Sequence, residues 1–276
     1  MTDTHDTMAA GSDVRGVIVD LDGTVYRGDT LVPGAAEAIR TLQGRGVSVC
    51  FCSNDPTKTP AEYVERLAGM GIDADASLIL PASTVTRDYL RENHAAESTY
   101  LVGSASLRSY LRESGQRLVD DPRDASVFVS SWDEAFDYDT LNDALAGVDD
   151  GTTFLGTDPD RTVPTGDGLM PGSGAITGSI ARTVGREPDH VLGKPSPEAA
   201  EAALDRLGVP AEDCLVVGDR LDTDLAMGAR FGMGTALVLT GVARRSDVPD
   251  SDVDPDFVLD SLADLPSTLT RGSAHS

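Results

Sequence analysis

Two aspartates near the N-terminus have the spacing to act together on one ligand. Asp20 and Asp22 follow the apolar run 16–19, and Gly23 and Thr24 come after them. An apolar run without alternation is typical of a strand buried on both faces of a parallel sheet. Residues two apart in an extended segment project to the same side, so the two carboxylates would repel each other without a cation. Hard oxygen ligands in this pattern favour Mg²⁺.

Two later apolar runs also stop at polar residues. The run 47–52 is followed by Ser53 and Asn54, and the run 214–217 leads to Asp219. In parallel sheets the carboxyl ends of the strands lie at one edge, where α/β proteins bind their ligands. We therefore expect these polar residues and the aspartate pair to lie at the same edge of one sheet.

A lysine in a turn adds a positive charge to this set. Lys194 lies in a Gly-Lys-Pro turn, in a chain whose only other lysine is Lys58. Carboxylates for a divalent cation, donors for oxyanions and one compact positive charge suit phosphoryl transfer, which depends mainly on positioning and charge neutralisation. A carboxylate nucleophile that forms an aspartyl-phosphate is one recognised route.

Taken singly, each of these residues has a structural alternative: a strand end, a solvated turn or a helix N-cap. Asp-Gly, for example, is a common turn dipeptide. Gly172 and Gly174 could cradle a phosphate, but without a third glycine at dinucleotide spacing they favour a turn at a helix start. The combination of residues favours the catalytic interpretation.

The surrounding pattern predicts an α/β fold. Apolar runs alternate with expected helices near 35–43, 60–70, 83–93, 105–114, 138–146, 175–185, 198–207 and 226–231. This alternation predicts βαβ units and a parallel, Rossmann-like sheet. The runs within 84–170 end without a comparable polar set, so we expect an inserted α/β domain there. The core domain would then consist of 14–83 and 171–266, with disordered tails at 1–13 and 267–276.

The chain is strongly acidic. Lys and Arg number 22 and Asp and Glu 46 among 276 residues, so the net charge is −24. This charge argues against nucleic acid and anionic membranes as partners. An acidic, lysine-poor composition resembles that of proteins from salt-accumulating microbes such as halophilic archaea, although an acidic mesophilic protein is the alternative.

Other kinds of chemistry are disfavoured. The cysteines lie in apolar runs, as expected for buried thiols in a reducing compartment, and their spacing does not suit zinc. The histidines lie near no candidate nucleophile. Residues 1–13 lack the features of a signal peptide, and no apolar run approaches membrane-spanning length, so we expect a cytoplasmic protein.

In their order and spacing, the motifs resemble those of haloacid dehalogenase (HAD) superfamily phosphatases, specifically the NagD-type, nitrophenylphosphatase-like subfamily IIA. The resemblance covers roughly 15–265 and rests on these motifs: Asp20-Leu21-Asp22-Gly23-Thr24, Ser53-Asn54, Asp158-Pro159-Asp160, Pro171-Gly172-Ser173-Gly174-Ala175, Gly193-Lys194-Pro195, Gly218-Asp219-Arg220, Thr223-Asp224 and Leu239-Thr240-Gly241-Val242. It implies a Mg²⁺-dependent phosphomonoesterase that acts on small phosphorylated metabolites. The inserted domain would be a C2-type cap that selects substrates and, as in relatives, could form a homodimer.

The resemblance also implies a role for each residue of the chemical centre. Asp20 would attack phosphorus, and Asp22 would protonate the leaving group and then activate water. Asp20, the backbone carbonyl of Asp22 and Asp219 would bind Mg²⁺, with Asp224 supporting these ligands.

Three further residues are implied to hold the phosphoryl group. Ser53 and Lys194 would bind its oxygens, with support from Asn54. Two acids depart from the family pattern, since Asp55 and Asp158 stand where relatives often have asparagine. The alternative function is a catalytically idle phosphate-sensing or scaffolding protein of the same fold.

A charge of −24 predicts that salt stabilises the fold. Self-repulsion is screened near 1 M salt, where the Debye length is about 3 Å. We expect the melting temperature to rise between low and molar KCl, measured by circular dichroism at fixed pH. A melting temperature that stays flat or falls over this range would contradict halophilic adaptation.

Overall fold

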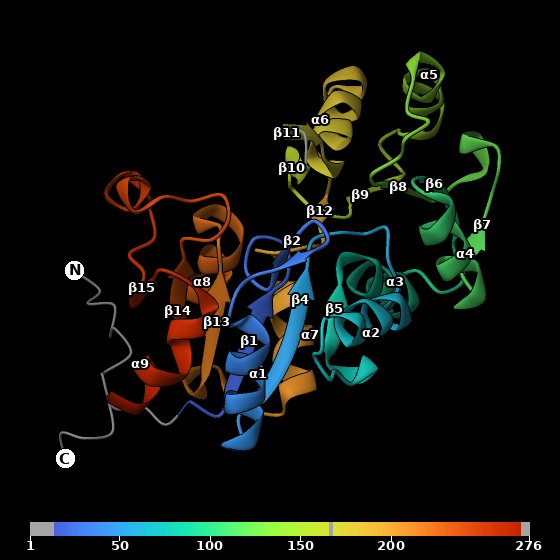
Figure 1. Cartoon of the computed structure of the whole chain (residues 1–276). Coiled ribbons are helices and arrows are strands. Elements are labelled where there is room, and N and C mark those ends of the chain that lie inside the picture. The colour runs from blue at the N-terminus through green and yellow to red at the C-terminus, as the bar shows by residue number, and fades with distance from the viewer. Residues whose placement is uncertain (1–13, 166–167, 272–276) are drawn as a thin grey trace, which may run out of the picture. The chain divides into compact units, whose positions relative to one another are not determined.

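Two β-sheets organise the chain (Figure 1). The computed structural model describes residues 14–165 and 168–271, and the tail expected at 1–13 lies outside the described part. The chain divides into two compact units. Within the described residues, the first unit contains 14–52, 64–79 and 200–271, and the second contains 53–63 and 80–199, with the gap at 166–167.

The larger sheet has six strands in the order β15-β14-β13-β1-β4-β5. Their bounds are β1 (Gly16–Asp20), β4 (Ser48–Ser53), β5 (Ile79–Pro81), β13 (Cys214–Gly218), β14 (Gly234–Val238) and β15 (Phe257–Leu259). β1 pairs in parallel with β13 on one side and with β4 on the other. All residues of β1, β13 and β14 are buried, which confirms the strands predicted from unbroken apolar runs.

The register brings the predicted strand ends level with one another. Asp20, the last residue of β1, lies opposite Cys52 of β4. Val19 lies opposite Val217, so β13 ends at Gly218 beside the end of β1 and Asp219 follows.

Helices accompany this sheet, and α1 and α9 lie in front of it in Figure 1. The bounds are α1 (Ala35–Gly44), α2 (Pro60–Gly69), α7 (Pro197–Leu207), α8 (Ala226–Arg230) and α9 (Leu265–Arg271). A short hairpin, β2 (Tyr26–Arg27) and β3 (Thr30–Leu31), follows β1. The sequence predicted a disordered tail from 267, but the chain is helical as far as Arg271. Leu265 and Pro266 at the start of α9 are buried, and Arg45 Nη1 donates to the Pro266 carbonyl at 2.6 Å, which anchors the helix.

The second sheet has five strands in the order β12-β9-β8-β6-β7, and all its pairs are parallel. The strands are β6 (Ser98–Val102), β7 (Arg117–Leu118), β8 (Val127–Ser130), β9 (Thr153–Gly156) and β12 (His190–Val191), and the helices of this unit are α3 (Ala82–Asn93), α4 (Ala105–Glu113), α5 (Tyr138–Gly147) and α6 (Ser173–Val184). Phe128 and Phe154 pack edge to face in its core, with ring centroids 5.9 Å apart. This second α/β unit agrees with the α/β insertion expected from the sequence, while its predicted boundaries, 84 and 170, stay a prediction.

One hairpin was not expected from the sequence. β10 (Thr162–Thr165) and β11 (Gly168–Pro171) pair antiparallel in a segment where the sequence predicted neither a helix nor a strand. The prolines and glycines hide the strand pattern. None of the helices within 14–165 and 168–271 combines the length and apolar character needed to span a bilayer.

Candidate active site

Asp20 and Asp22 leave the end of β1 in different environments. Asp20 is buried, whereas Asp22 is exposed. The chain turns between them and Tyr26: Gly23 adopts φ +91°, and the Gly23 N–H donates to the Tyr26 carbonyl at 2.7 Å. The sequence predicted that both side chains project to the same side, but the turn that begins at Leu21 gives the two carboxylates different exposure.

The loop after β13 carries two more buried carboxylates. A π-helical turn at Leu221–Leu225 places Asp224 so close to Gly218 that a side chain at 218 would collide with its carboxylate. The Arg220 N–H donates to Asp224 Oδ2 at 3.1 Å. Asp219 Oδ2 accepts a hydrogen bond of 2.6 Å from the Val242 N–H, and the Asp219 carbonyl accepts one of 3.0 Å from Ala243.

Asp20, Asp219 and Asp224 form one acidic cluster within the first unit. One carboxylate oxygen from each lies within 4.8 Å of the others, and all three residues are buried. Buried like charges at this distance repel strongly, and a hard divalent cation with oxygen ligands relieves the repulsion. The donor set therefore fits Mg²⁺. The carboxylate of Asp224 belongs to this cluster, whereas that of Asp22 is not among its members within the described chain.

Two glycines make room for the Asp219 carboxylate. A Cβ atom on Gly23 or on Gly241 would overlap Asp219 Oδ2. The Thr240 hydroxyl donates to the Gly23 carbonyl at 2.6 Å, which ties the two glycine loops together. The sequence presents Gly241 only as part of a motif, because its partner Asp219 lies 22 residues away in the chain.

Substitution of Gly241 by alanine tests this arrangement. The methyl group would displace Asp219, and a displacement of about 1 Å can cost about 10²-fold in rate. We expect Gly241→Ala to lose at least about 10²-fold in kcat and to require more Mg²⁺ for half-maximal activity. Gly44→Ala is the control, because nothing lies within 4 Å of a Cβ there. Equal activity of the two variants would contradict the assignment.

In the second unit, Asn54 joins two segments that are far apart in the chain. Its Nδ2 donates to the Lys194 carbonyl at 3.1 Å, and its Oδ1 accepts from the Lys194 N–H at 2.8 Å. Gly193 lies so close that an added Cβ would be 2.7 Å from Asn54 Oδ1. Asn54 and Lys194 are both buried. Asn54 therefore uses its amide to hold the backbone of Lys194, and its implied role in supporting a bound phosphoryl group stays a prediction.

Ser53 is the last residue of β4 and is buried. Its hydroxyl accepts from the Asp55 N–H at 3.2 Å and bonds the Tyr63 hydroxyl at 3.2 Å. Tyr63 was not predicted to belong to the site, because an aromatic residue on the apolar face of a helix has the pattern of core packing. Lys58 is only one-third exposed and binds Asp55, 2.6 Å from Nζ to Oδ2.

Asp158, the other departure from the family pattern, is a buried acid on the loop after β9. Burial, and secondarily the charge of Asp160, raises its pKa to about 8. This loop explains the nearby glycines: side chains at Gly172 or Gly174 would collide with the carbonyls of Asp160 or Pro159, respectively. Gly172 is the N-cap of α6 and Gly174 lies in its first turn, which agrees with the helix-start interpretation.

The raised pKa predicts a pH-dependent stability. Between about pH 4 and 8 the folded chain holds a proton on Asp158 that the unfolded chain has lost, so stability falls with rising pH by up to about 1.4 kcal/mol per pH unit. We expect the melting temperature of Asp158→Asn, relative to wild type, to increase from pH 5 to 8 and to level off above about pH 9.

Asp75→Asn is the control for this titration. A hydrogen bond from the Ser77 N–H lowers the pKa of Asp75, so its contribution is complete above about pH 4 and should not change from pH 5 to 8. A constant difference for Asp158→Asn as well would mean that Asp158 is ionised throughout this range.

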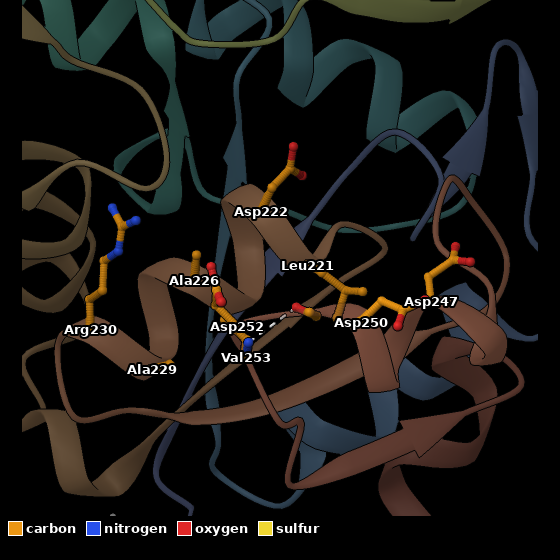
Figure 2. A pocket seen from close by; sticks show the side chains of 10 residues that line it. Leu221, Asp222, Ala226, Ala229, Arg230, Asp247, Asp250, Asp252 and Val253 are labelled. Carbon is orange, nitrogen blue, oxygen red and sulfur yellow. Dashed lines mark hydrogen bonds between the residues drawn. The ribbon is translucent and has the colours of Figure 1, made fainter.

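A separate open pocket of about 720 Å³ lies in the first unit (Figure 2). Figure 2 shows Asp222 and Leu221 from the π-helical turn, Ala226 and Arg230 from α8, and Asp250 from the segment before β15. None of the predicted site residues is among its lining residues. Its four carboxylates against one guanidinium make it unsuited to an anionic phosphate ester.

Comparisons with known proteins agree with the geometry. A family model described as haloacid dehalogenase-like hydrolase matches residues 17–117, and a second, HAD-hydrolase-like model matches 191–265. The sugar-phosphatase AraL of Bacillus subtilis is 35% identical over 98% of this chain and 97% of its own. A p-nitrophenyl phosphatase from Archaeoglobus fulgidus superposes with a TM-score of 0.87 at 34% identity, covering 92% and 99% of the two chains. NagD from E. coli K-12 superposes with a TM-score of 0.82 at 30% identity, covering 91% of this chain and 97% of NagD.

Proposed function

We propose a Mg²⁺-dependent, aspartyl-phosphate mechanism for this chain, which belongs to the haloacid dehalogenase-like hydrolase family and is a phosphatase. Its proposed substrates are small phosphorylated metabolites. The acidic cluster of Asp20, Asp219 and Asp224 carries this proposal. It lies at the carboxyl ends of β1 and β13, where open α/β sheets bind ligands.

Asp20 is the proposed nucleophile and Asp22 the proposed acid and base. An Asp20 oxygen attacks phosphorus while the ester P–O bond breaks, and the leaving oxygen takes a proton from Asp22. Water then attacks phosphorus and gives its proton to Asp22, the P–Oδ bond to Asp20 breaks, and phosphate leaves. The exposure of Asp22, and its place outside the acidic cluster, support this role because a proton donor must reach a leaving group.

Asp20, Asp219 and the Asp22 carbonyl would hold Mg²⁺, beside Asp224. The bound cation would neutralise charge on the carboxylates and on the phosphoryl oxygens. The chain's own contribution is to hold Asp219 with the Val242 N–H and Asp224 with the Arg220 N–H.

Ser53 and Lys194 are the proposed ligands of the phosphoryl oxygens. Cys52 lies opposite Asp20 in the sheet and Ser53 is the next residue of the chain, which supports the assignment. Asn54 would act through the backbone of Lys194, because its side-chain amide forms hydrogen bonds with both the carbonyl and the N–H of that residue.

The relatives support sugar phosphates as the first substrate class to test, since the Bacillus subtilis protein is named a sugar-phosphatase. Glycerol phosphate, phosphoglycolate and nucleoside monophosphates are the other classes within this proposal. A homodimer formed by the second unit, a cytoplasmic location, a halophilic source and the absence of nucleic-acid and membrane partners stay predictions.

The proposed roles are tested with Asp22→Ala in rapid mixing. p-Nitrophenolate leaves without a proton, whereas a sugar alkoxide does not, and acid–base help is worth about 10²–10⁴-fold. We expect p-nitrophenyl phosphate to give a burst of about one equivalent of p-nitrophenol per site, followed by slow turnover. A sugar phosphate should give no burst.

Asp20→Asn is the matched control, because it retains Asp22 but lacks the nucleophile. It should show neither burst nor turnover with either substrate. Steady-state hydrolysis by this variant would overturn the covalent mechanism. A uniform slowing of both substrates in Asp22→Ala, without a burst, would remove the acid–base role from Asp22.

A further inference from the structure

Two donors surround the hydroxyl oxygen of Ser53 in the second unit. The Asp55 N–H and the Tyr63 hydroxyl each lie 3.2 Å from Ser53 Oγ. A serine hydroxyl has two acceptor positions and one proton. The Asp55 N–H donates to one acceptor position, and the Tyr63 hydroxyl lies at the second, with its single proton shared between Ser53 Oγ and Asp55 Oδ2.

Local structure fixes the position of Tyr63. Thr59 and Glu62 form a capping box, with the Thr59 N–H donating to Glu62 Oε2 at 2.7 Å and the Glu62 N–H donating to Thr59 Oγ1 at 3.4 Å. This box starts α2, and Tyr63 follows in the first turn with its N–H bonded to the Thr59 carbonyl at 3.2 Å. Tyr63 is completely buried, so its rigid ring has little freedom.

Asp55 holds the tyrosine hydroxyl from the other side. Tyr63 Oη lies 3.1 Å from Asp55 Oδ2, which Lys58 Nζ also approaches to 2.6 Å. Asp55 Oδ1 accepts from the Thr57 N–H at 2.8 Å. Burial tends to raise the pKa of Asp55, but the charge of Lys58 and the hydrogen bonds from Lys58 and Thr57 outweigh it, so the pKa lies below its usual value. The charged network therefore keeps the tyrosine oxygen in one place.

We propose that Tyr63 is a positioning residue for the phosphatase reaction: its hydroxyl fixes the place of the Ser53 oxygen, and Ser53 donates its proton to a phosphoryl oxygen of the bound substrate, which is a more strongly charged acceptor than the tyrosine oxygen. The inference rests on the proposed function, in which Ser53 binds the phosphoryl group. Tyr63 itself would touch neither the substrate nor the reacting atoms.

A double-mutant cycle tests this proposal with Tyr63→Phe, Ser53→Ala and the double variant. Phenylalanine keeps the buried ring and removes only the hydroxyl. A net hydrogen bond corresponds to about 3- to 10-fold, so we expect Tyr63→Phe to lower kcat/KM for p-nitrophenyl phosphate by that factor. The inhibition constant for inorganic phosphate should rise in the same variant. In the Ser53→Ala background, Tyr63→Phe should cause no further loss, because its partner is absent.

Tyr100→Phe is the matched control. Its hydroxyl donates to Asp143 Oδ2 at 2.7 Å in the same unit, so the variant loses a hydroxyl–carboxylate bond without touching Ser53. Its kcat/KM should equal that of wild type at temperatures below the melting transition.

The cycle separates the inference from the proposed function. Equal losses from Tyr63→Phe in both backgrounds would overturn the positioning role, because Tyr63 would then act through the fold. Full activity of Ser53→Ala would overturn the inference by removing Ser53 from phosphoryl binding. If the wild-type protein released no phosphate, the proposed function itself would fail.

Discussion

Mutual repulsion of three buried carboxylates is the constraint on which the rest of the first unit depends. Asp20, Asp219 and Asp224 bring their oxygens within 4.8 Å of one another at the end of two central strands. Folding alone does not favour such a cluster, because like charges that are buried close together repel each other strongly. The chain holds Asp219 and Asp224 with backbone N–H groups, and it clears the space around Asp219 with Gly23 and Gly241. This arrangement fits the Mg²⁺ proposed for the site.

Asp158 is a buried acid that avoids a buried charge by staying protonated. It lies in the second unit, and the nearest charge that acts on it is another acid, Asp160. Burial and the charge of Asp160 outweigh the hydrogen bond with Ser173 and raise its pKa to about 8, so the group is mainly neutral at neutral pH. A protonated acid at this position resembles the asparagine that the family often has there. Replacing asparagine by Asp158 therefore adds little charge to this position at neutral pH.

Side-chain to backbone bonds organise the second group of proposed site residues. Asn54 gives both ends of its amide to Lys194, and Gly193 allows the close approach. The backbone of the lysine is thus fixed by Asn54. Ser53 is held in a similar way, by the N–H of Asp55 and the hydroxyl of Tyr63.

The sequence by itself determined the buried strands and the polar residues that end them. Unbroken apolar runs report burial on both faces, and the polar residues that end them, Asp20 and Asp219, follow from the same pattern. Only the tertiary structure decided that the carboxylate of Asp224 joins this cluster while that of Asp22 stays outside, and that Gly241 packs against Asp219. Tyr63 lies ten residues beyond its partner Ser53, and only the turn of the chain before α2 brings the two hydroxyls together. Periodicity reports which face of an element is buried, whereas such contacts depend on how loops and elements pack, which no local pattern encodes.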